Sequence, residues 1–403
     1  MRVATATLYN STISQLQRRQ QEMQQTQLQL TTGKKVADAS DDPTGAARVE
    51  RSLAAIGRVD ANQRALEASR NSMVLAESAL GDASEILQQI RETLLAAGNA
   101  SYGDSERKGL AQKIAGLRNE LLSIANRPDG SGGYVFSGQG ASAPPFLDEP
   151  GGVRFNGVPG NVQTGNLEDF DLTVDGRQTW EQARSGNGTF VSAPAPNANT
   201  GNPPTAWISP GSVYDPSLVT GDAYTIQITG TTGLSQATIT NVTTGSTVVQ
   251  FPFTPGQALK FDGLVVNING TVTDGDTFTI DPSTDELSVF DVLDRVVGEL
   301  QTPLRNGIQI QQSNAIAIRD LDQAFGNLGS QRSRVGEKLN GLDGSETRLS
   351  GLKLYNQTER SAAEDLDMTE AISRFQVQQT SYDAALRSYA AVQRLNLFQY
   401  LNF

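Results

Sequence analysis

The chain offers few side chains that could perform chemistry, because its 403 residues include no cysteine and no histidine. Their absence removes disulfides, thiolate nucleophiles and zinc-thiolate sites, together with the commonest general acid, general base and metal ligand near neutral pH. Catalysis would depend on carboxylates, lysine, serine or tyrosine, and no arrangement of these residues is typical of an active site. We predict that the chain is not an enzyme and has no catalytic residues.

Two groups of aspartates are candidate sites for a hard cation, since Ca²⁺ and Mg²⁺ prefer carboxylate oxygens. The first group is Asp38, Asp41 and Asp42. Asp42 precedes Pro43, and a carboxylate followed by proline is typical of a helix start, so a capping role explains this group more simply. The second group, the Asp-Gly-Asp triplet at 274–276, lacks the later ligands of a calcium loop and is better explained as a hairpin turn. We therefore predict no metal and no cofactor.

Residues 128–140 are rich in glycine and could suggest a nucleotide-binding loop. Neither a preceding buried strand nor a following helix supports that hypothesis, and Gly33-Lys34 lacks the upstream glycine of a phosphate loop. We interpret residues 128–140 as a turn and the first strand that leaves a helical region.

The charge distribution argues against nucleic-acid and membrane partners. The formal net charge is −12, and residues 140–285 contain 14 acidic but only 4 basic side chains. An acidic segment repels phosphate groups, because each contact with a phosphate needs a cation. No apolar run approaches the roughly 20 residues of a membrane-spanning helix, and the N-terminus lacks the apolar core of a secretory signal. If the protein leaves the cell, we expect a route that reads no cleaved signal.

Heptad patterns predict long helices that pair with each other in both outer thirds of the chain. Apolar residues recur every seven positions between residues 59 and 94 and between residues 321 and 349, and a third stripe at 110–124 indicates a helix that folds back on the first. Glycines between residues 326 and 351 leave two readings open, a closely packed helix or a loop. The predicted core of this helical rod comprises Val59, Leu66, Met73, Leu80, Leu87, Leu94, Leu110, Ile114, Leu117, Leu121, Leu321, Leu328, Val335, Leu342 and Leu349.

The two ends of the chain carry helical patterns that invite burial against another subunit. Residues 8–30 have a thin apolar stripe among many glutamines and would form only a marginal helix alone. Residues 372–401 are apolar and aromatic at helical spacing. The predicted subunit-interface residues are Leu16, Met23, Leu30, Ile372, Phe375, Tyr382, Leu386, Tyr389, Leu395, Phe398 and Leu401.

The middle of the chain predicts an all-β insert. Apolar and polar residues alternate over 224–228, 264–268 and 278–280, as expected of half-buried antiparallel strands, and Asn-Gly and Asp-Gly turns separate such runs. Residues 193–205 are low in apolar content, and we expect a long exposed loop there. The predicted fold class is α+β, in which long N- and C-terminal helices pair into an antiparallel bundle or coiled coil that carries an inserted β domain.

A short linker motif joins the first two predicted helices. Residues 30–48 read LTTGKKVADASDDPTGAAR, in which Gly33 is a helix stop and Asp42 with Pro43 forms a helix start. The segment resembles the flagellin superfamily, in which a Leu-x-[Ser/Thr]-Gly-x-[Lys/Arg]-[Val/Ile] sequence precedes an Asp-Asp pair. The opening MRVATATLYNSTISQLQ and the C-terminal DLDMTEAISRF agree with this resemblance. Within the superfamily the chain is more similar to the hook-associated protein 3 family than to filament flagellins.

The resemblance, which covers both helical ends but not the insert, implies a rod-shaped subunit of an axial polymer with five segments. The terminal helices would pair into an inner tube, and the β insert would lie outside. The implied segments are 1–45, the N-terminal inner-tube helix and linker; 46–140 and 286–362, the two parts of the rod; 141–285, the outer β domain; and 363–403, the C-terminal inner-tube helix.

The resemblance also implies a function without catalysis. Such a subunit would lie outside the cell at the junction of flagellar hook and filament, after export through the flagellar type III channel. Its implied partners are hook-associated protein 1, flagellin, copies of itself in a ring and a flagellar export chaperone. A filament flagellin is the closest alternative and would differ in copy number. An adhesin or carbohydrate-binding protein is disfavoured because Trp180 and Trp207 are the only tryptophans available for stacking on sugars.

Overall fold

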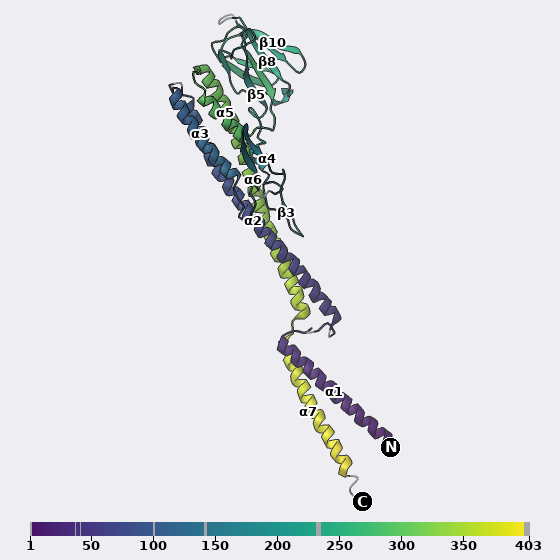
Figure 1. The fold of residues 1–403 in the computed structure, drawn as a ribbon. Coiled ribbons are helices and arrows are strands. Elements are labelled where there is room, and N and C mark those ends of the chain that lie inside the picture. The colour runs from purple at the N-terminus through teal and green to yellow at the C-terminus, as the bar shows by residue number, and fades with distance from the viewer. Residues whose placement is uncertain are drawn as a thin grey trace. The chain divides into compact units, whose positions relative to one another are not determined.

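The computed structural model describes residues 2–36, 38–40, 42–99, 101–140, 143–230 and 235–398. The helices are α1 (Arg2–Thr32), α2 (Pro43–Ala97), α3 (Asp104–Ala125), α4 (Gly176–Trp180), α5 (Val289–Gln301), α6 (Gly307–Glu364) and α7 (Met368–Phe398), with a short 3-10 helix, Pro216–Leu218. The strands are β1 (Phe146–Glu149), β2 (Gly152–Phe155), β3 (Gln163–Thr164), β4 (Phe170–Asp171), β5 (Phe190–Ala195), β6 (Ala206–Ile208), β7 (Ser212–Val213), β8 (Tyr224–Thr229), β9 (Ser235–Asn241), β10 (Ser246–Phe253), β11 (Ala258–Phe261), β12 (Leu264–Gly270) and β13 (Thr277–Pro282). Long helices at both ends with antiparallel strands between them confirm the predicted fold class (Figure 1).

The chain forms two compact units. Unit 1 contains Met1–Arg64, Asn166–Glu168 and Ser345–Phe403, and therefore includes α1, α7 and parts of α2 and α6. Unit 2 contains Ala65–Gly165 and Asp169–Gly344, with the other helices and the strands. The five-segment division expected from the sequence stays a prediction.

In unit 2, α2 and α6 run antiparallel and are joined by ion pairs. Arg70 contacts Asp343 at 2.9 Å, and Arg91 contacts Asp322 at 2.7 Å. The two arginines are 21 residues apart on α2, and their two aspartate partners are 21 residues apart, in the opposite order, on α6. Three whole heptads fit that spacing, so the apolar stripes of the two helices keep the same register. The buried stripe residues in this part are Leu66, Met73, Leu80, Leu87, Leu94, Leu321, Leu328, Val335 and Leu342.

The glycines that left the continuity of α6 open lie within one continuous helix of 58 residues. An added Cβ would meet no atom within 4 Å at Gly326, Gly329, Gly336, Gly341 or Gly351. Close packing within the described chain therefore does not explain these glycines, each of which costs a helix interior about 1 kcal/mol relative to alanine. Tertiary contacts must supply the helical stability that the glycines remove.

A separate helix, α5, packs against α3 and was not distinguished from the rod in the sequence. The Ser288 side chain caps its first turn by accepting a bond from the N–H of Asp291. The guanidinium of Arg118 on α3 donates to Asp294 of α5 at 2.9 Å and to Asp148 of β1 at 2.8 Å. Arg118 itself is buried, and the two carboxylates together accept hydrogen bonds from three nitrogens of its guanidinium.

The first part of the insert shares a core with the helices. The ring centroids of Phe146 and Trp180 lie 6.0 and 6.1 Å from that of Phe290 on α5. The first strand expected in residues 128–140 is absent from this described segment, which contains turns and isolated bridges. Phe136 is fully buried with its ring 5.4 Å from that of Trp180, so core packing and isolated backbone bridges hold this segment without a regular strand.

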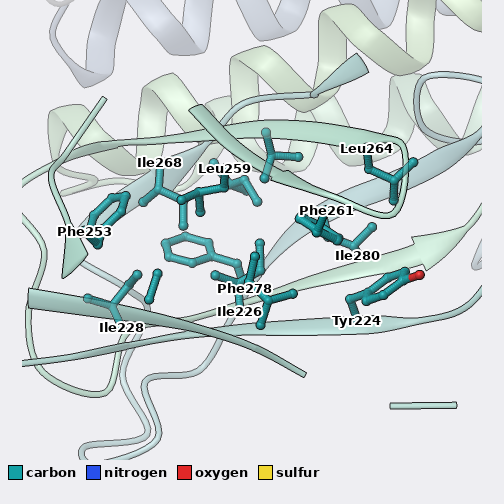
Figure 2. Packing of buried hydrophobic residues seen from close by; sticks show 14 of the residues in the cluster. Tyr224, Ile226, Ile228, Phe253, Leu259, Phe261, Leu264, Ile268, Phe278 and Ile280 are labelled. Carbon is teal, nitrogen blue, oxygen red and sulfur yellow. The ribbon is translucent and has the colours of Figure 1, made fainter. Parts of the chain in front are cut away.

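The rest of the insert is a β sandwich with its own core. Its larger sheet has the strand order β10-β9-β8-β13-β5, and the smaller has the order β11-β12-β6 with β7 paired to β12. The predicted strands at 224–228, 264–268 and 278–280 are confirmed as β8, β12 and β13. Their alternate side chains enter one buried apolar cluster between the sheets (Figure 2).

The long exposed loop expected at residues 193–205 is wrong in two respects. Residues 193–195 belong to β5, and Asn197 is buried. The Asn197 side-chain amide donates to Asp276 at 2.9 Å, and Asp276 is itself fully buried. These polar residues satisfy each other inside the protein, which a low apolar content alone does not reveal.

Two buried polar side chains of α6 attach the sandwich to the helices. Gln312 Oε1 accepts a hydrogen bond from the N–H of Ile208 at 2.8 Å, and its Nε2 donates to the Ile208 carbonyl at 3.2 Å. Gln312 thereby takes the place of a further strand beside the edge strand β6. Arg319 donates to the Ser192 carbonyl at 2.9 Å and to Asp320 at 2.8 Å.

Replacing Gln312→Leu should lower the free energy of unfolding by about 1–3 kcal/mol, because two buried backbone groups lose their partner. Urea unfolding measures the loss, and hydrogen exchange at the Ile208 amide should become faster. Gln311→Leu, at the neighbouring exposed position, is the matched control and should change neither. Equal stability of the two variants would contradict the attachment role.

Candidate subunit-contact surface

The linkers next to the terminal helices pair with each other in unit 1. Gly33 ends α1 with a φ of +69°. The N–H of Lys35 donates to the carbonyl of Glu364 at 2.7 Å, and the N–H of Leu366 donates to the carbonyl of Gly33 at 3.0 Å. Lys34 also forms an ion pair with the Glu364 side chain. These contacts fix the points at which α1 ends and α7 begins.

Asp42 caps α2, which begins at Pro43. One carboxylate oxygen accepts bonds from the N–H groups of Thr44 at 3.1 Å and Gly45 at 3.0 Å, and from the Thr44 hydroxyl at 2.8 Å. The Gly45 N–H, followed by the Thr44 hydroxyl, lowers the pKa of Asp42 because both groups favour the charged carboxylate. The Asp42 carboxylate therefore acts as the N-terminal cap of α2. Asp41 lies outside the described residues.

The helices α1 and α7 contact each other but enclose almost no core. Among their described side chains, only Thr26 and Ala371 are buried. The predicted interface residues Leu16, Met23, Leu30, Phe375, Tyr382 and Tyr389 are half-buried. Ile372 and Leu386 are 46% and 39% exposed. Leu395 and Phe398 fall within α7, and Leu401 lies outside the described residues.

Exposed apolar residues are concentrated in unit 1. This unit has fewer than a third of the residues but ten of the eighteen large apolar residues that are exposed in the described chain. Monomeric proteins tolerate such residues singly, whereas groups of them mark contacts with other molecules. The ten are Leu28, Leu53, Leu167, Leu352, Leu354, Tyr355, Met368, Ile372, Val377 and Leu386.

The residues predicted for the rod core lie inside the helical packing. Leu110 is half-buried, and the other fourteen are buried. Sequence reasoning missed the second core position of each heptad, three residues after each α2 stripe position. The buried residues at that position of α2 are Asn62, Ser69, Ala76, Ala83, Ile90 and Ala97.

Polar residues at this second position bind one short segment, residues 166–171, which we call the strap. The residues concerned are Asn62 and Ser69 on α2, and Lys338 and Ser345 on α6. A buried polar side chain needs a partner, so a polar residue at a core heptad position is a signal for such a contact. The sequence contained this signal but did not identify the partner.

The strap is held by its backbone as well as its side chains. Asn62 is fully buried, and its side-chain oxygen accepts bonds from the N–H groups of Asn166 at 3.0 Å and Leu167 at 3.1 Å. Arg348 makes two bonds to Glu168, at 2.8 and 3.1 Å. The Arg348 guanidinium, followed by the Ser345 hydroxyl, lowers the pKa of the Glu168 carboxyl.

The carboxylates of the described residues form no group that could hold a metal ion. A polar cleft of 730 Å³ contains Glu181 and Asp291, and burial raises the pKa of both. Glu181 accepts a bond from the N–H of Phe155 at 2.8 Å, which is a structural contact. The chain has no cysteine or histidine to complete a nucleophilic site there. None of the described helices is both long and apolar enough to cross a membrane.

Three family models match the chain. The bacterial flagellin N-terminal helical region matches residues 3–141, and the bacterial flagellin C-terminal helical region matches residues 317–401. The D2-like domain of flagellar hook-associated protein 1 matches residues 196–282, which lie in the sandwich.

Individual relatives match over most of the chain. Flagellar hook-associated protein 3 of Escherichia coli is 23% identical over 411 aligned positions, which cover 99% of each chain. The crystal structure of flagellar hook associated protein-3 from Legionella pneumophila is 25% identical with a TM-score of 0.70, and the match covers 77% of this chain and 97% of that one. FlgL of Xanthomonas campestris is 26% identical with a TM-score of 0.65, over 77% and 99% of the two chains.

Replacing Asn62→Leu should release the strap, because the N–H groups of Asn166 and Leu167 lose their acceptor. Limited proteolysis with mass spectrometry should show about tenfold faster cleavage after Glu168, as expected for the loss of one or two hydrogen bonds of about 1 kcal/mol each. Asn71→Leu changes an exposed asparagine of the same helix and should leave the cleavage rate unchanged. Equal rates in both variants would show that Asn62 does not hold the strap.

The stability difference between the wild type and Glu168→Gln should depend on pH. The folded-state pKa of Glu168 is depressed, so its contribution is present above the unfolded pKa of about 4.5 and is lost as pH falls through the folded value. Urea unfolding between pH 7 and pH 3 should show the wild type more stable at pH 7 and the difference shrinking below about pH 4.5. Glu92→Gln removes an exposed carboxylate of α2 and should show little change with pH. A pH-independent difference for Glu168→Gln would rule out the ion pair as its cause.

Proposed function

The chain belongs to the flagellin superfamily, and we propose that it is a structural subunit of the bacterial flagellum at the junction between hook and filament. The observation that carries this proposal is the match to flagellar hook-associated protein 3 over nearly the full length of both chains. The flagellin models at both helical ends place the chain among axial subunits, and the hook-associated domain model in the middle favours the junction over the filament.

Unit 1 has the physical properties that such a subunit needs. A subunit that is added to a growing polymer must keep apolar surface exposed until its neighbours cover it. The poor burial in α1 and α7 and the ten exposed apolar residues supply that surface. Covering it would release roughly 25 cal/mol per Å² before the ordering costs of association are subtracted. The interface residues predicted in α1 and α7 are therefore our candidates for contacts between subunits.

The proposed partners follow from a position at the junction. Hook-associated protein 1 would contact the subunit on the hook side and flagellin on the filament side, and copies of the chain would complete a ring. An export chaperone would hold the chain before its passage through the flagellar channel to the outside of the cell. The proposed role needs no catalysis, which agrees with the absence of cysteine and histidine.

Deleting the gene should leave hooks without filaments and release flagellin into the medium, and the wild-type gene should restore filaments. The variant Ile372→Asp with Leu386→Asp should fail to restore them, because charges would enter the proposed contact. Its monomer should melt within about 2 °C of the wild type, since both residues are exposed in one copy. Electron microscopy of the cells and thermal melting of the purified chains measure the two effects.

Val242→Asp, an exposed position of the sandwich, is the matched control and should restore filaments. Normal filaments in the deletion strain would disprove the junction role. Restoration by the double aspartate variant would instead remove α7 from the contact surface.

A further inference from the structure

Arg107, near the start of α3, has one guanidinium nitrogen that no group of the described chain satisfies. Its Nη1 atom is buried and has no hydrogen-bond partner, and the side chain forms no ion pair with a described residue. Buried polar atoms normally have a partner, and a buried cation normally has a counter-charge. This nitrogen therefore points to a guest that the chain itself does not supply.

Arg107 lines a small pocket in unit 2, where α3 and α5 lie side by side (Figure 1) and approach α2 and α6. The pocket has a volume of 20 Å³, which holds a guest of about the size of one water molecule and excludes organic molecules. Its polar lining residues are Arg107, Glu299, Arg305, Ser313 and Asn314. The other walls are apolar, so a charge in the pocket is screened less than a charge on the surface. They comprise Leu94, Ala97, Val296, Leu300, Ile310 and Ala317.

The charged residues that line the pocket leave a surplus of one positive charge. Glu299 is the one carboxylate among the described lining residues, and it pairs with Arg305 at 3.8 Å. Arg295 lies one turn before Glu299 on α5 and pairs instead with Asp320. The charge of Arg305 is thus balanced within the chain, whereas that of Arg107 is not.

The carboxylates at the start of α3 do not balance Arg107 either. Asp104 accepts a hydrogen bond from the N–H of Leu304 at 3.1 Å, and Glu106 accepts one from the N–H of Gly103 at 3.0 Å. Neither forms an ion pair with Arg107. The next residue of the helix, Lys108, is exposed and adds a further positive charge. The charges around this end of α3 therefore favour an anionic guest.

We propose that the pocket binds one halide ion, which accepts a hydrogen bond from Arg107 Nη1. A halide supplies the missing negative charge and brings no hydrogen-bond donors of its own, whereas a water molecule would satisfy the nitrogen but leave the charge unbalanced. The ion would also lie beside Arg305, so it would connect α3 to the loop between α5 and α6. This site goes beyond the proposed function, because it would stabilise the helical packing of a single copy.

Thermal melting of the full-length chain tests the site in solution. The melting midpoint should be about 3 °C higher in about 0.3 M sodium chloride than in the same concentration of sodium gluconate, whose anion is too large for the pocket. A ligand that binds only the folded chain raises the midpoint in this way. Arg107→Met removes the guanidinium and should abolish the difference. Lys108→Met removes the neighbouring exposed cation and, as the matched control, should retain it.

Bromide soaked into crystals of the full-length chain locates the ion directly, because its anomalous scattering distinguishes it from water. We expect an anomalous peak beside Arg107 Nη1. A water molecule there without such a peak would overturn the inference, as would equal chloride effects in Arg107→Met and Lys108→Met. A bromide peak without a chloride effect on the melting of the wild type would show binding at crystal concentration only, and would also overturn it. If Arg107→Met does not fold, the two measurements on the wild type still decide the question.

Discussion

The antiparallel packing of α2 against α6 is the constraint on which the other helical contacts depend. Antiparallel helices bring the linker before α2 and the linker after α6 back to the same end, where Lys35 and Glu364 pair. The same packing aligns two heptad stripes whose residues are far apart in sequence. Ion pairs across the seam are individually weak, so apolar burial supplies the stability and the charges help to fix the register.

Polar residues within that seam make its register more specific. Asn62 and Ser345 would destabilise an apolar core if they had no partner, and each obtains one from the strap. A shift by one heptad would separate these side chains from the groups of the strap that they bind in this alignment. The strap therefore favours one alignment of the helices over the others that a heptad repeat permits.

The β sandwich and the terminal helices differ in how completely one copy buries them. Both sheets of the sandwich contribute to one enclosed cluster, so this part of the chain provides its own core (Figure 2). The terminal helices bury one described residue each, Thr26 on α1 and Ala371 on α7. Isolated helices draw little stability from intrinsic propensity, and we propose that contacts between subunits stabilise α1 and α7. One copy of the chain thus contains the complete core of the sandwich but no comparable core between α1 and α7.

The sequence by itself determined the helix-sheet-helix order, the apolar stripes and the alternating strands, because these patterns follow local periodicity. The sequence also determined the linker between α1 and α2, since Gly33, Asp42 and Pro43 end or start a helix through the local backbone conformation and local hydrogen bonds. Only the tertiary structure decided that α5 is a separate helix against α3, that Phe136 enters a core instead of a strand, and that Gln312 extends a sheet. The hydrogen-bond partner of Asn62, Asn166, lies 104 residues away in the sequence, and that of Asn197, Asp276, lies 79 residues away. Polar contacts over such separations leave no periodic signal, because their energy depends on which distant groups the fold brings within hydrogen-bonding distance.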